Sequence, residues 1–184
     1  MTTSYPVHTI DSAPAGSRAQ LEDVRSSLGM LPNLAAAMAE SPTLVRSFFA
    51  VREIYKAGTL GARETEVLSL TNAVENGCDW CVAFHSMMAT KSGVPAATIA
   101  AIRSRGLPAD ERDRALVTLS RELIRRRGDV PEAVLAEFRS AGFSSAQVLE
   151  VILGIAFSTM ANYTQHVVHA PLDTMLEAHR WHER

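Results

Sequence analysis

The chain has 184 residues, of which 47% are hydrophobic and 21% charged, and its formal net charge is −2. This length suits a single domain that buries a core without covalent cross-links, and the charge gives no electrostatic reason to expect binding to nucleic acid or an anionic membrane. The first twenty residues lack a basic start followed by an apolar stretch, so we expect no signal peptide and a cytoplasmic location. We also expect an N-terminal arm over 1–16 and a single domain over 17–184.

Glycines and prolines stand where helices are expected to end and begin. Apolar residues recur at three- and four-residue spacing between them, which predicts helices. The expected helices are 17–28, 33–40, 42–57, 63–76, 78–92, 95–105, 110–127, 131–141, 145–169 and 172–181. The expected C-terminal caps are Gly29, Gly58, Gly77, Gly93, Gly106, Gly128 and Gly142. No segment shows the alternation of β-branched residues that predicts hairpins, so the expected fold class is all-α.

Two cysteines, Cys78 and Cys81, stand directly after Asn76-Gly77, which is expected to end a helix. Cys78 then lies in the first turn of the next helix, where unpaired N–H groups and the helix dipole favour a thiolate. Residues three apart on a helix have Cα atoms about 5–6 Å apart, a distance that a disulfide accepts. His85 lies on the same face, where an imidazole can take a proton from a thiol. These residues predict a thiol redox centre.

Glu66 precedes this motif by twelve residues, with Gly77 in between. If the two helices turn back on each other, Glu66 can approach His85 and orient its ring. On spacing alone, the favoured interpretation is a first-turn glutamate that stabilises a helix N-terminus. Glu75 is nearer in sequence and is a rival acid.

Residues 151–172 contain no Asp, Glu, Lys or Arg. Apolar residues occur all round this helix, which predicts a central core helix that also lines a subunit interface. Its polar side chains make it too polar for a membrane span. His166, on this helix, is a candidate for a pocket facing His85, although a buried, hydrogen-bonded histidine is a commoner role for such a residue.

A shift of 81 residues aligns residues 64–86 with residues 145–167 and places His85 on His166. The alignment predicts two related helical units packed about a pseudo-twofold axis, of which only the first contains cysteines. Two unrelated amphipathic helices would align about as well, so both interpretations stay open.

The motif that runs from Glu66 through the CDWC sequence at 78–81 to His85 resembles the signature of the alkylhydroperoxidase D (AhpD)-like proteins, in the carboxymuconolactone decarboxylase superfamily. The resemblance extends from about residue 31 to residue 176. It implies an all-helical, internally duplicated fold that assembles as homo-trimers or homo-hexamers. It also implies a peroxidase or disulfide-reductase activity.

Roles for four side chains follow from this resemblance. Cys81 corresponds to the peroxide-attacking cysteine, Cys78 to the more exposed resolving cysteine, and Glu66 and His85 to the proton-relay pair. Helix-terminus electrostatics instead favour Cys78 as the more acidic thiol. The implied partners are hydrogen peroxide or an alkyl hydroperoxide as substrate, and a dithiol protein or small thiol as reductant. No Gly-rich phosphate loop or dinucleotide fingerprint occurs, so we expect no cofactor.

Trp80 departs from the family pattern, because peroxidase members of the family place a relay histidine before the second cysteine. An indole cannot shuttle protons and offers only a donor N–H. We expect Trp80 to pack over the cysteines and line a pocket. Thiol chemistry survives this loss, while the peroxide step lacks one relay group.

Other functions remain open on the sequence alone. A redox sensor without turnover, or an oligomeric binding protein, would use the same dithiol. A zinc site would require both cysteines with His85 and Glu66, since the chain has no second CxxC, and we expect no metal. The decarboxylases of the superfamily work without this cysteine pair, which makes lactone decarboxylation a poor match.

Overall fold

The computed structural model describes residues 5–182, which form helices and no strand. The helices are α1 (Ala15–Leu28), α2 (Asn33–Met38), α3 (Pro42–Lys56), α4 (Ala62–Glu75), α5 (Asp79–Lys91), α6 (Ala96–Arg103), α7 (Glu111–Arg125), α8 (Glu132–Ser140), α9 (Ser145–Val168) and the 3-10 helix η1 (Thr174–His179). The predicted all-α class is confirmed, and each predicted segment overlaps one observed helix. Of the predicted arm, residues 1–4 lie outside the described residues, and Ala13 is buried in the core.

Most of the predicted glycine caps have the left-handed backbone conformation. Positive φ angles occur at Gly29, Gly77, Gly93, Gly128 and Gly142. The prediction was wrong for Gly58 and Gly106. After α6, Arg105 takes the left-handed conformation (φ 59°), one residue before the glycine, and α3 ends at Lys56 with the right-handed Ala57 as its C-cap.

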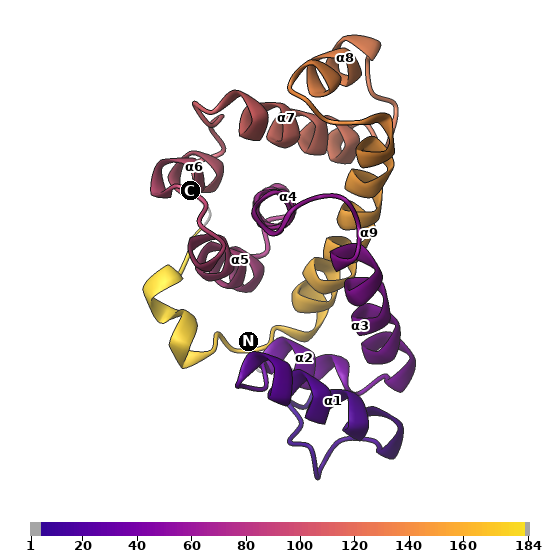
Figure 1. Cartoon of the computed structure of the whole chain (residues 1–184). Helices are drawn as coiled ribbons and strands as arrows, with labels where there is room; N and C mark the ends of the chain where they lie inside the picture. The colour runs from indigo at the N-terminus through magenta and orange to yellow at the C-terminus, as the bar shows by residue number, and fades with distance from the viewer. Residues whose placement is uncertain (1–4, 183–184) are drawn as a thin grey trace.

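Helix α4 is the centre of the fold. Figure 1 shows it end-on in the middle of the molecule, with α5, α6, α7 and α9 around it. Residues 67–74 are all buried, including Ser69, Thr71 and Asn72. The hydroxyl of Thr71 donates to the carbonyl of Val67 at 2.7 Å, which satisfies it within the helix. Because these polar side chains interrupt the apolar pattern of α4, the sequence does not indicate that this helix is at the centre of the fold.

Helix α9 was predicted to be the central core helix, and this prediction is wrong. One face packs against α3 and α4, and the opposite face exposes apolar side chains. The exposed ones are Leu149 (67% exposed), Ile152 (46%), Tyr163 (60%) and Val167 (59%). Among the described helices, α9 alone has the length and hydropathy of a membrane span, which is weak evidence because core helices pass the same test.

The predicted repeat is not reproduced in local structure. Residues 64–86 form parts of two helices separated by a turn, whereas the aligned residues 145–167 lie in the single helix α9. The break at Gly77 aligns with Ser158, which lies inside α9. The two segments therefore position their aligned side chains differently.

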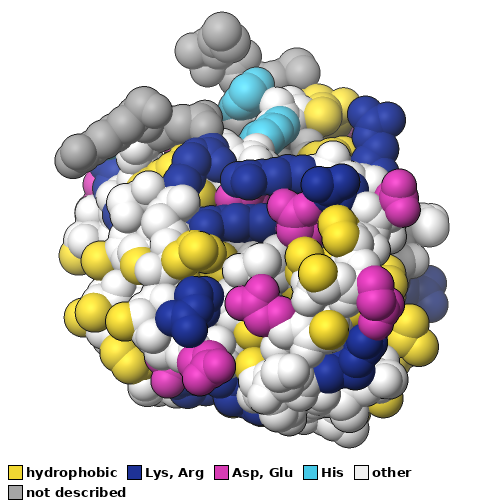
Figure 2. Space-filling view, turned by 90° about the horizontal axis from the view of Figure 1, so that it is seen from above, with side chains coloured by type: hydrophobic (Ala, Val, Ile, Leu, Met, Phe, Trp, Pro, Cys, Tyr) yellow, Lys and Arg dark blue, Asp and Glu magenta, His cyan; other side chains and the backbone are white. Residues whose placement is uncertain are grey.

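The surface carries charges of both signs. On the face that Figure 2 shows, Lys and Arg side chains lie beside Asp and Glu side chains. Several surface charges are paired, such as Arg126 with Glu122 and Arg180 with Glu177. This mixture gives that face no single sign of charge.

Gly154 allows α9 to pack closely against its neighbours. A Cβ atom at this position would lie 2.5 Å from Leu68 Cδ2, on α4, and 2.8 Å from Tyr55 Oη, on α3. Both distances are shorter than van der Waals contact, and both side chains are buried. The position therefore has no room for a side chain.

Gly154→Ala tests this packing, because two effects oppose each other. Alanine favours a helix interior over glycine by about 1 kcal/mol, whereas overpacking a core costs about 1–3 kcal/mol. The net expectation is a fall of up to about 2 kcal/mol in the free energy of unfolding in urea. Ala156→Gly, at an exposed position of the same helix, measures the helix propensity alone. A gain in stability for Gly154→Ala would contradict the close packing.

Candidate active site

The site is built on the turn between α4 and α5. The N–H of Gly77 donates to the carbonyl of Val74 at 3.2 Å, and the N–H of Cys78 donates to the carbonyl of Ala73 at 2.9 Å. With Gly77 at φ 66°, this is a Schellman motif. Glycine takes this conformation without a steric penalty, so the sequence Asn76-Gly77 fixes where α4 ends.

Cys78 ends this motif and also begins α5 as its N-cap. Its Sγ accepts a hydrogen bond from the N–H of Cys81 at 3.3 Å. The predicted helix began at Cys78, whereas α5 begins at Asp79. Cys78 therefore precedes the first turn and does not lie inside it. The two sulfurs form a disulfide, and the Cα atoms are 5.2 Å apart, within the predicted range. A thiolate at the N-cap would face the unpaired N–H groups of the helix.

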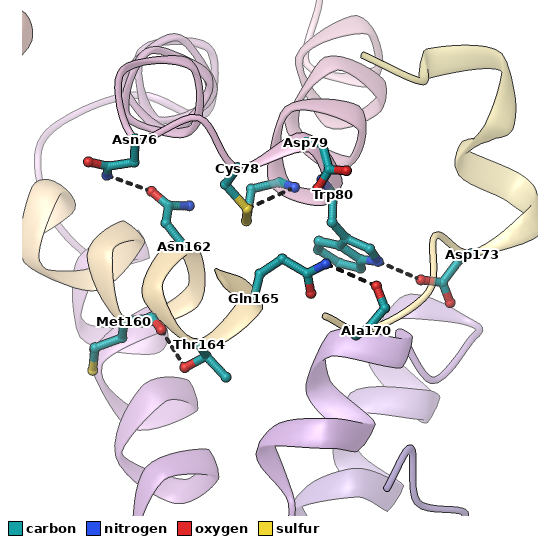
Figure 3. Close-up of a disulfide and its surroundings, with 11 residues drawn as sticks. Asn76, Cys78, Asp79, Trp80, Met160, Asn162, Thr164, Gln165, Ala170 and Asp173 are labelled. Carbon is teal, nitrogen blue, oxygen red and sulfur yellow. Dashed lines mark hydrogen bonds between the residues drawn. A yellow bond between two sulfur atoms is a disulfide. The ribbon is translucent and has the colours of Figure 1, made fainter. Parts of the chain in front are cut away.

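The predicted exposure of Cys78 is wrong for this disulfide form. Cys78 is 0% exposed and Cys81 is 1% exposed. Helix α9 covers the turn, and the amide of Asn76 donates to Asn162 on α9 at 2.8 Å (Figure 3). Cys81 lines a cavity that opens to the surface, where the exposed Lys56 also lines it, and Cys78 is not part of the lining. A small molecule in the cavity would therefore meet Cys81 first.

Glu66 lies beside His85, as the sequence allowed if the helices turned back. Glu66 Oε2 is 2.9 Å from His85 Nδ1, and both side chains are mostly buried. Glu66 is eleven residues before Gly77 and His85 eight after it. At about 1.5 Å per residue, both lie at similar heights on the helical hairpin. The rival acid, Glu75, instead pairs with Arg121 at 2.9 Å.

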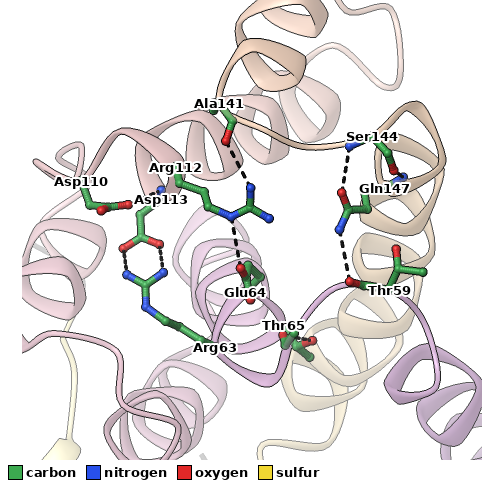
Figure 4. A network of polar contacts seen from close by, with 11 residues as sticks. Thr59, Arg63, Glu64, Thr65, Asp110, Arg112, Asp113, Ala141, Ser144 and Gln147 are labelled. Atoms are coloured by element: carbon green, nitrogen blue, oxygen red, sulfur yellow. Dashed lines mark hydrogen bonds and ion pairs between the residues drawn. The ribbon is translucent and has the colours of Figure 1, made fainter.

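A polar network fixes the start of α4, one turn from Glu66 (Figure 4). Both terminal nitrogens of Arg63 donate to the carboxylate of Asp113 on α7, each at 2.6 Å. The Asp113 side chain is fully buried. Arg112 donates to Glu64 at 3.2 Å. A two-pronged pair of this kind constrains orientation as well as distance, so α4 cannot rotate freely about its axis.

Trp80 packs beside the cavity, as predicted. Its ring stacks on Phe84 with centroids 5.2 Å apart, and its Nε1–H donates to Asp173 Oδ2 at 3.0 Å (Figure 3). Burial raises the pKa of Asp173, and hydrogen bonds from the Asn33 N–H and from Trp80 partly offset this rise. No local sequence pattern points to Asp173 as this partner, because it lies 93 residues after Trp80.

His166 does not line the cavity, so this prediction is wrong. Its side chain is exposed. The α9 residues that reach the cavity are Phe157, Ser158 and Ala161. At about 100° per residue, His166 lies about 140° round the helix from Ala161, which turns it away from the cavity.

The cavity has a volume of about 110 Å³ and is lined by Cys81, His85 and Glu66 together with mostly apolar side chains. An engineered apolar cavity of about 150 Å³ binds benzene, so this space accommodates a ligand of about one ring. The structure thus brings three of the four predicted catalytic residues onto one cavity. Within residues 5–182, no group of three His, Cys, Asp or Glu side chains is placed to hold a metal ion.

Comparison with known proteins gives a family match over part of the chain, and a fold. Residues 42–110 match the carboxymuconolactone decarboxylase family. This segment contains α4, α5 and all four predicted catalytic residues. No curated protein sequence matches the chain significantly.

Several solved structures share the fold over nearly the whole chain. A peroxidase-related protein with an alkylhydroperoxidase AhpD core from Ralstonia eutropha JMP134 has a TM-score of 0.83 at 21% identity, covering 96% of this chain and 95% of that one. A peroxidase-related protein from Silicibacter sp. TM1040 has a TM-score of 0.78 at 21% identity, covering 94% and 92%. A variant of the debrominase Bmp8 in complex with 2,3,4-tribromopyrrole has a TM-score of 0.77 at 16% identity, covering 97% and 95%.

The stability of the fold is expected to depend on the ionisation of Asp173. Because burial raises its pKa, the folded state holds the proton at higher pH than the unfolded state, whose pKa is about 3.9. The free energy of unfolding therefore falls as the pH rises above about 4, through the raised pKa. Asp173→Asn removes this loss. We expect urea unfolding to show that the mutant gains stability relative to the wild type between pH 4 and pH 7.

Asp129→Asn, at an exposed position, is the matched control for the loss of one negative charge. An equal pH dependence in both mutants would contradict the role of burial at Asp173.

Proposed function

We infer that the chain is an AhpD-like protein of the carboxymuconolactone decarboxylase superfamily, as the match over residues 42–110 and the fold indicate. From this premise, we propose that it is a thiol-dependent peroxidase that reduces hydrogen peroxide or alkyl hydroperoxides. The observation that carries the proposal is the shared cavity. Cys81, His85 and Glu66 line it, and Cys78 is joined to Cys81 directly behind it.

The first step oxidises Cys81. With Nδ1 of His85 hydrogen-bonded to Glu66, the other ring nitrogen is free to take the proton of the Cys81 thiol one helical turn away. The thiolate attacks the outer oxygen of ROOH, so that an S–O bond forms as the O–O bond breaks. The leaving alkoxide takes the proton from His85. The products are ROH and a sulfenic acid on Cys81.

The second step forms the disulfide that the structure contains. The sulfur of Cys78 attacks the sulfenic sulfur of Cys81, and hydroxide leaves as water after taking the thiol proton. An external dithiol then returns two electrons by thiol–disulfide exchange. Because Cys81 lines the cavity and Cys78 is covered by α9, a small dithiol meets Cys81 first. A dithiol protein requires the covering helices to move.

Trp80 takes no part in this proton transfer. Its single N–H donates to Asp173, so it has no donor left for a substrate. The relay that we propose therefore consists of Glu66 and His85 alone.

A second candidate is reductive removal of a halogen from a small ring, with the dithiol as the source of two electrons. The ring-sized cavity and the likeness to the fold of a debrominase favour it. Release of bromide from a bromopyrrole, matched by disulfide formation, would distinguish it from peroxide reduction.

The oligomeric state, the cellular location and the absence of a cofactor are also proposals. The exposed apolar side chains of α9 support assembly into a homo-trimer or homo-hexamer, because such a stripe is more stable when it is covered. We propose that the assembly is cytoplasmic and works without a cofactor.

Mutation of each cysteine tests the proposed function. Cys81→Ser removes the attacking sulfur, so we expect no peroxide consumption. Cys78→Ser removes the resolving sulfur, so we expect a single turnover that leaves a sulfenic acid on Cys81, which dimedone traps and mass spectrometry detects. The double mutant provides the background rate.

Equal single turnovers in the two cysteine mutants would refute the assignment of roles. A wild-type protein that is oxidised once but does not cycle with excess dithiothreitol would instead indicate a redox sensor.

A further inference from the structure

Two cations stand at the mouth of the cavity that contains Cys81. Arg52 and Lys56 both line it, and they lie four residues apart on one face of α3. Lys56 is exposed, whereas the Arg52 side chain is mostly buried, so the pair marks the side on which the cavity meets solvent. Like charges at this spacing repel each other and destabilise a helix, and a bound anion would relieve that repulsion.

The acids nearby leave this positive charge in excess. Glu66 is the one carboxylate that lines the cavity within residues 5–182, and it is bound to His85 at 2.9 Å. Glu53 pairs with Nη1 of Arg52 at 2.8 Å, but the Glu53 side chain is 68% exposed, where water screens the pair. Glu150 lies near the end of α3, where two backbone N–H groups of the following loop donate to its carboxylate.

Both cations have hydrogen-bond donors to spare. Within the described part of the chain, the ammonium group of Lys56 forms no hydrogen bond or ion pair, and Arg52 uses Nη1 alone, in its pair with Glu53. The Nε and Nη2 atoms of Arg52 are not sealed in the core. Two neighbouring guanidinium nitrogens match the two oxygens of a carboxylate, so this edge of Arg52 suits an anionic group.

The reactive groups come from the other side of the cavity. Cys81 and His85 lie on α5, which Figure 1 shows apart from α3. A ligand that fills the cavity therefore has one end near the sulfur and the other near the cations. Between them it meets aromatic walls, such as the rings of Phe48 and Phe157, whose centroids are 4.6 Å apart. The carboxylate of Glu66 repels an anionic group from the reactive end, so charge would also orient the ligand.

We propose that the substrate of this site is a small organic anion, whose carboxylate pairs with Arg52 and Lys56 at the mouth while a body of about one ring fills the cavity. The volume of about 110 Å³ sets the size of that body. The inference rests on the proposed function and adds the charge and the orientation of its substrate. The end that reacts is held toward Cys81 because the charged end is held at α3.

Binding to the oxidised protein tests the site without turnover. In calorimetry, benzoate should bind at one site at least about tenfold more tightly than benzamide, its uncharged counterpart. Lys56→Gln and Arg52→Gln are each expected to weaken benzoate binding by about fivefold or more, and Lys56→Glu by more than Lys56→Gln. Sodium chloride at about 0.5 M should reduce the preference for benzoate, because it screens exposed charges.

Matched controls separate ligand binding from helix stability. Lys56 is the last residue of α3, where a positive charge stabilises the helix dipole. Lys91, the only other lysine of the sequence, is the last residue of α5 and does not line the cavity. Lys91→Gln should therefore lower the Tm about as much as Lys56→Gln and leave benzoate binding unchanged. Arg46→Gln, at an exposed position of α3, is the control for Arg52→Gln.

Turnover with excess dithiothreitol tests the substrate itself. We expect the wild type to favour cumene hydroperoxide that carries a para carboxylate over plain cumene hydroperoxide by at least about tenfold in kcat/KM. Lys56→Gln and Arg52→Gln should each reduce this ratio by about fivefold or more, whereas Lys91→Gln and Arg46→Gln should keep it.

The two experiments separate this inference from the proposed function. Equal binding of benzoate and benzamide, with equal kcat/KM for the two hydroperoxides, would overturn the inference while leaving the peroxidase proposal in place. A wild type that consumes neither hydroperoxide, yet binds benzoate through Arg52 and Lys56, would support the anion site and overturn the peroxidase proposal.

Discussion

The reversal of the chain at Gly77 is the constraint on which the site depends. Its left-handed backbone ends α4, and the next residue, Cys78, serves as the N-cap of α5. The helical hairpin that results brings Glu66 within 2.9 Å of His85 and places Cys81 one turn before that histidine. A residue with a Cβ at position 77 would strain this turn.

The central helix and the cavity give this hairpin its chemistry. Because α4 is buried over two turns and clamped to α7 at its start through Arg63, Glu66 is held on a rigid element. Helix α9 closes the site from the other side, covering Cys78 and leaving Cys81 on the cavity. A mostly apolar cavity strengthens the few polar contacts within it, which suits a site that controls one thiolate and one proton.

Local patterns in the sequence predicted the helices and the redox motif, since caps and three- or four-residue spacing act within a few residues. The pairing of Glu66 with His85 was predictable only as one outcome of the turn at Gly77. Longer-range features were missed. The partnership of Trp80 with Asp173 joins residues 93 apart, and the burial of α4 is masked by its own polar residues. The apolar residues of α9 suggested burial on most sides of that helix, and His166 was therefore predicted to face the cavity. The structure instead places His166 on the exposed side.

The most direct test of the central claim is the mass of the intact, reduced protein before and after one equivalent of an organic hydroperoxide, with peroxide loss followed in parallel in metal-free buffer. A dithiol that reacts as proposed loses two hydrogen atoms. The account therefore predicts a decrease of about two mass units, matched by one equivalent of peroxide consumed for each subunit. An unchanged mass with no peroxide consumed would contradict the account and leave the two cysteines a packing role.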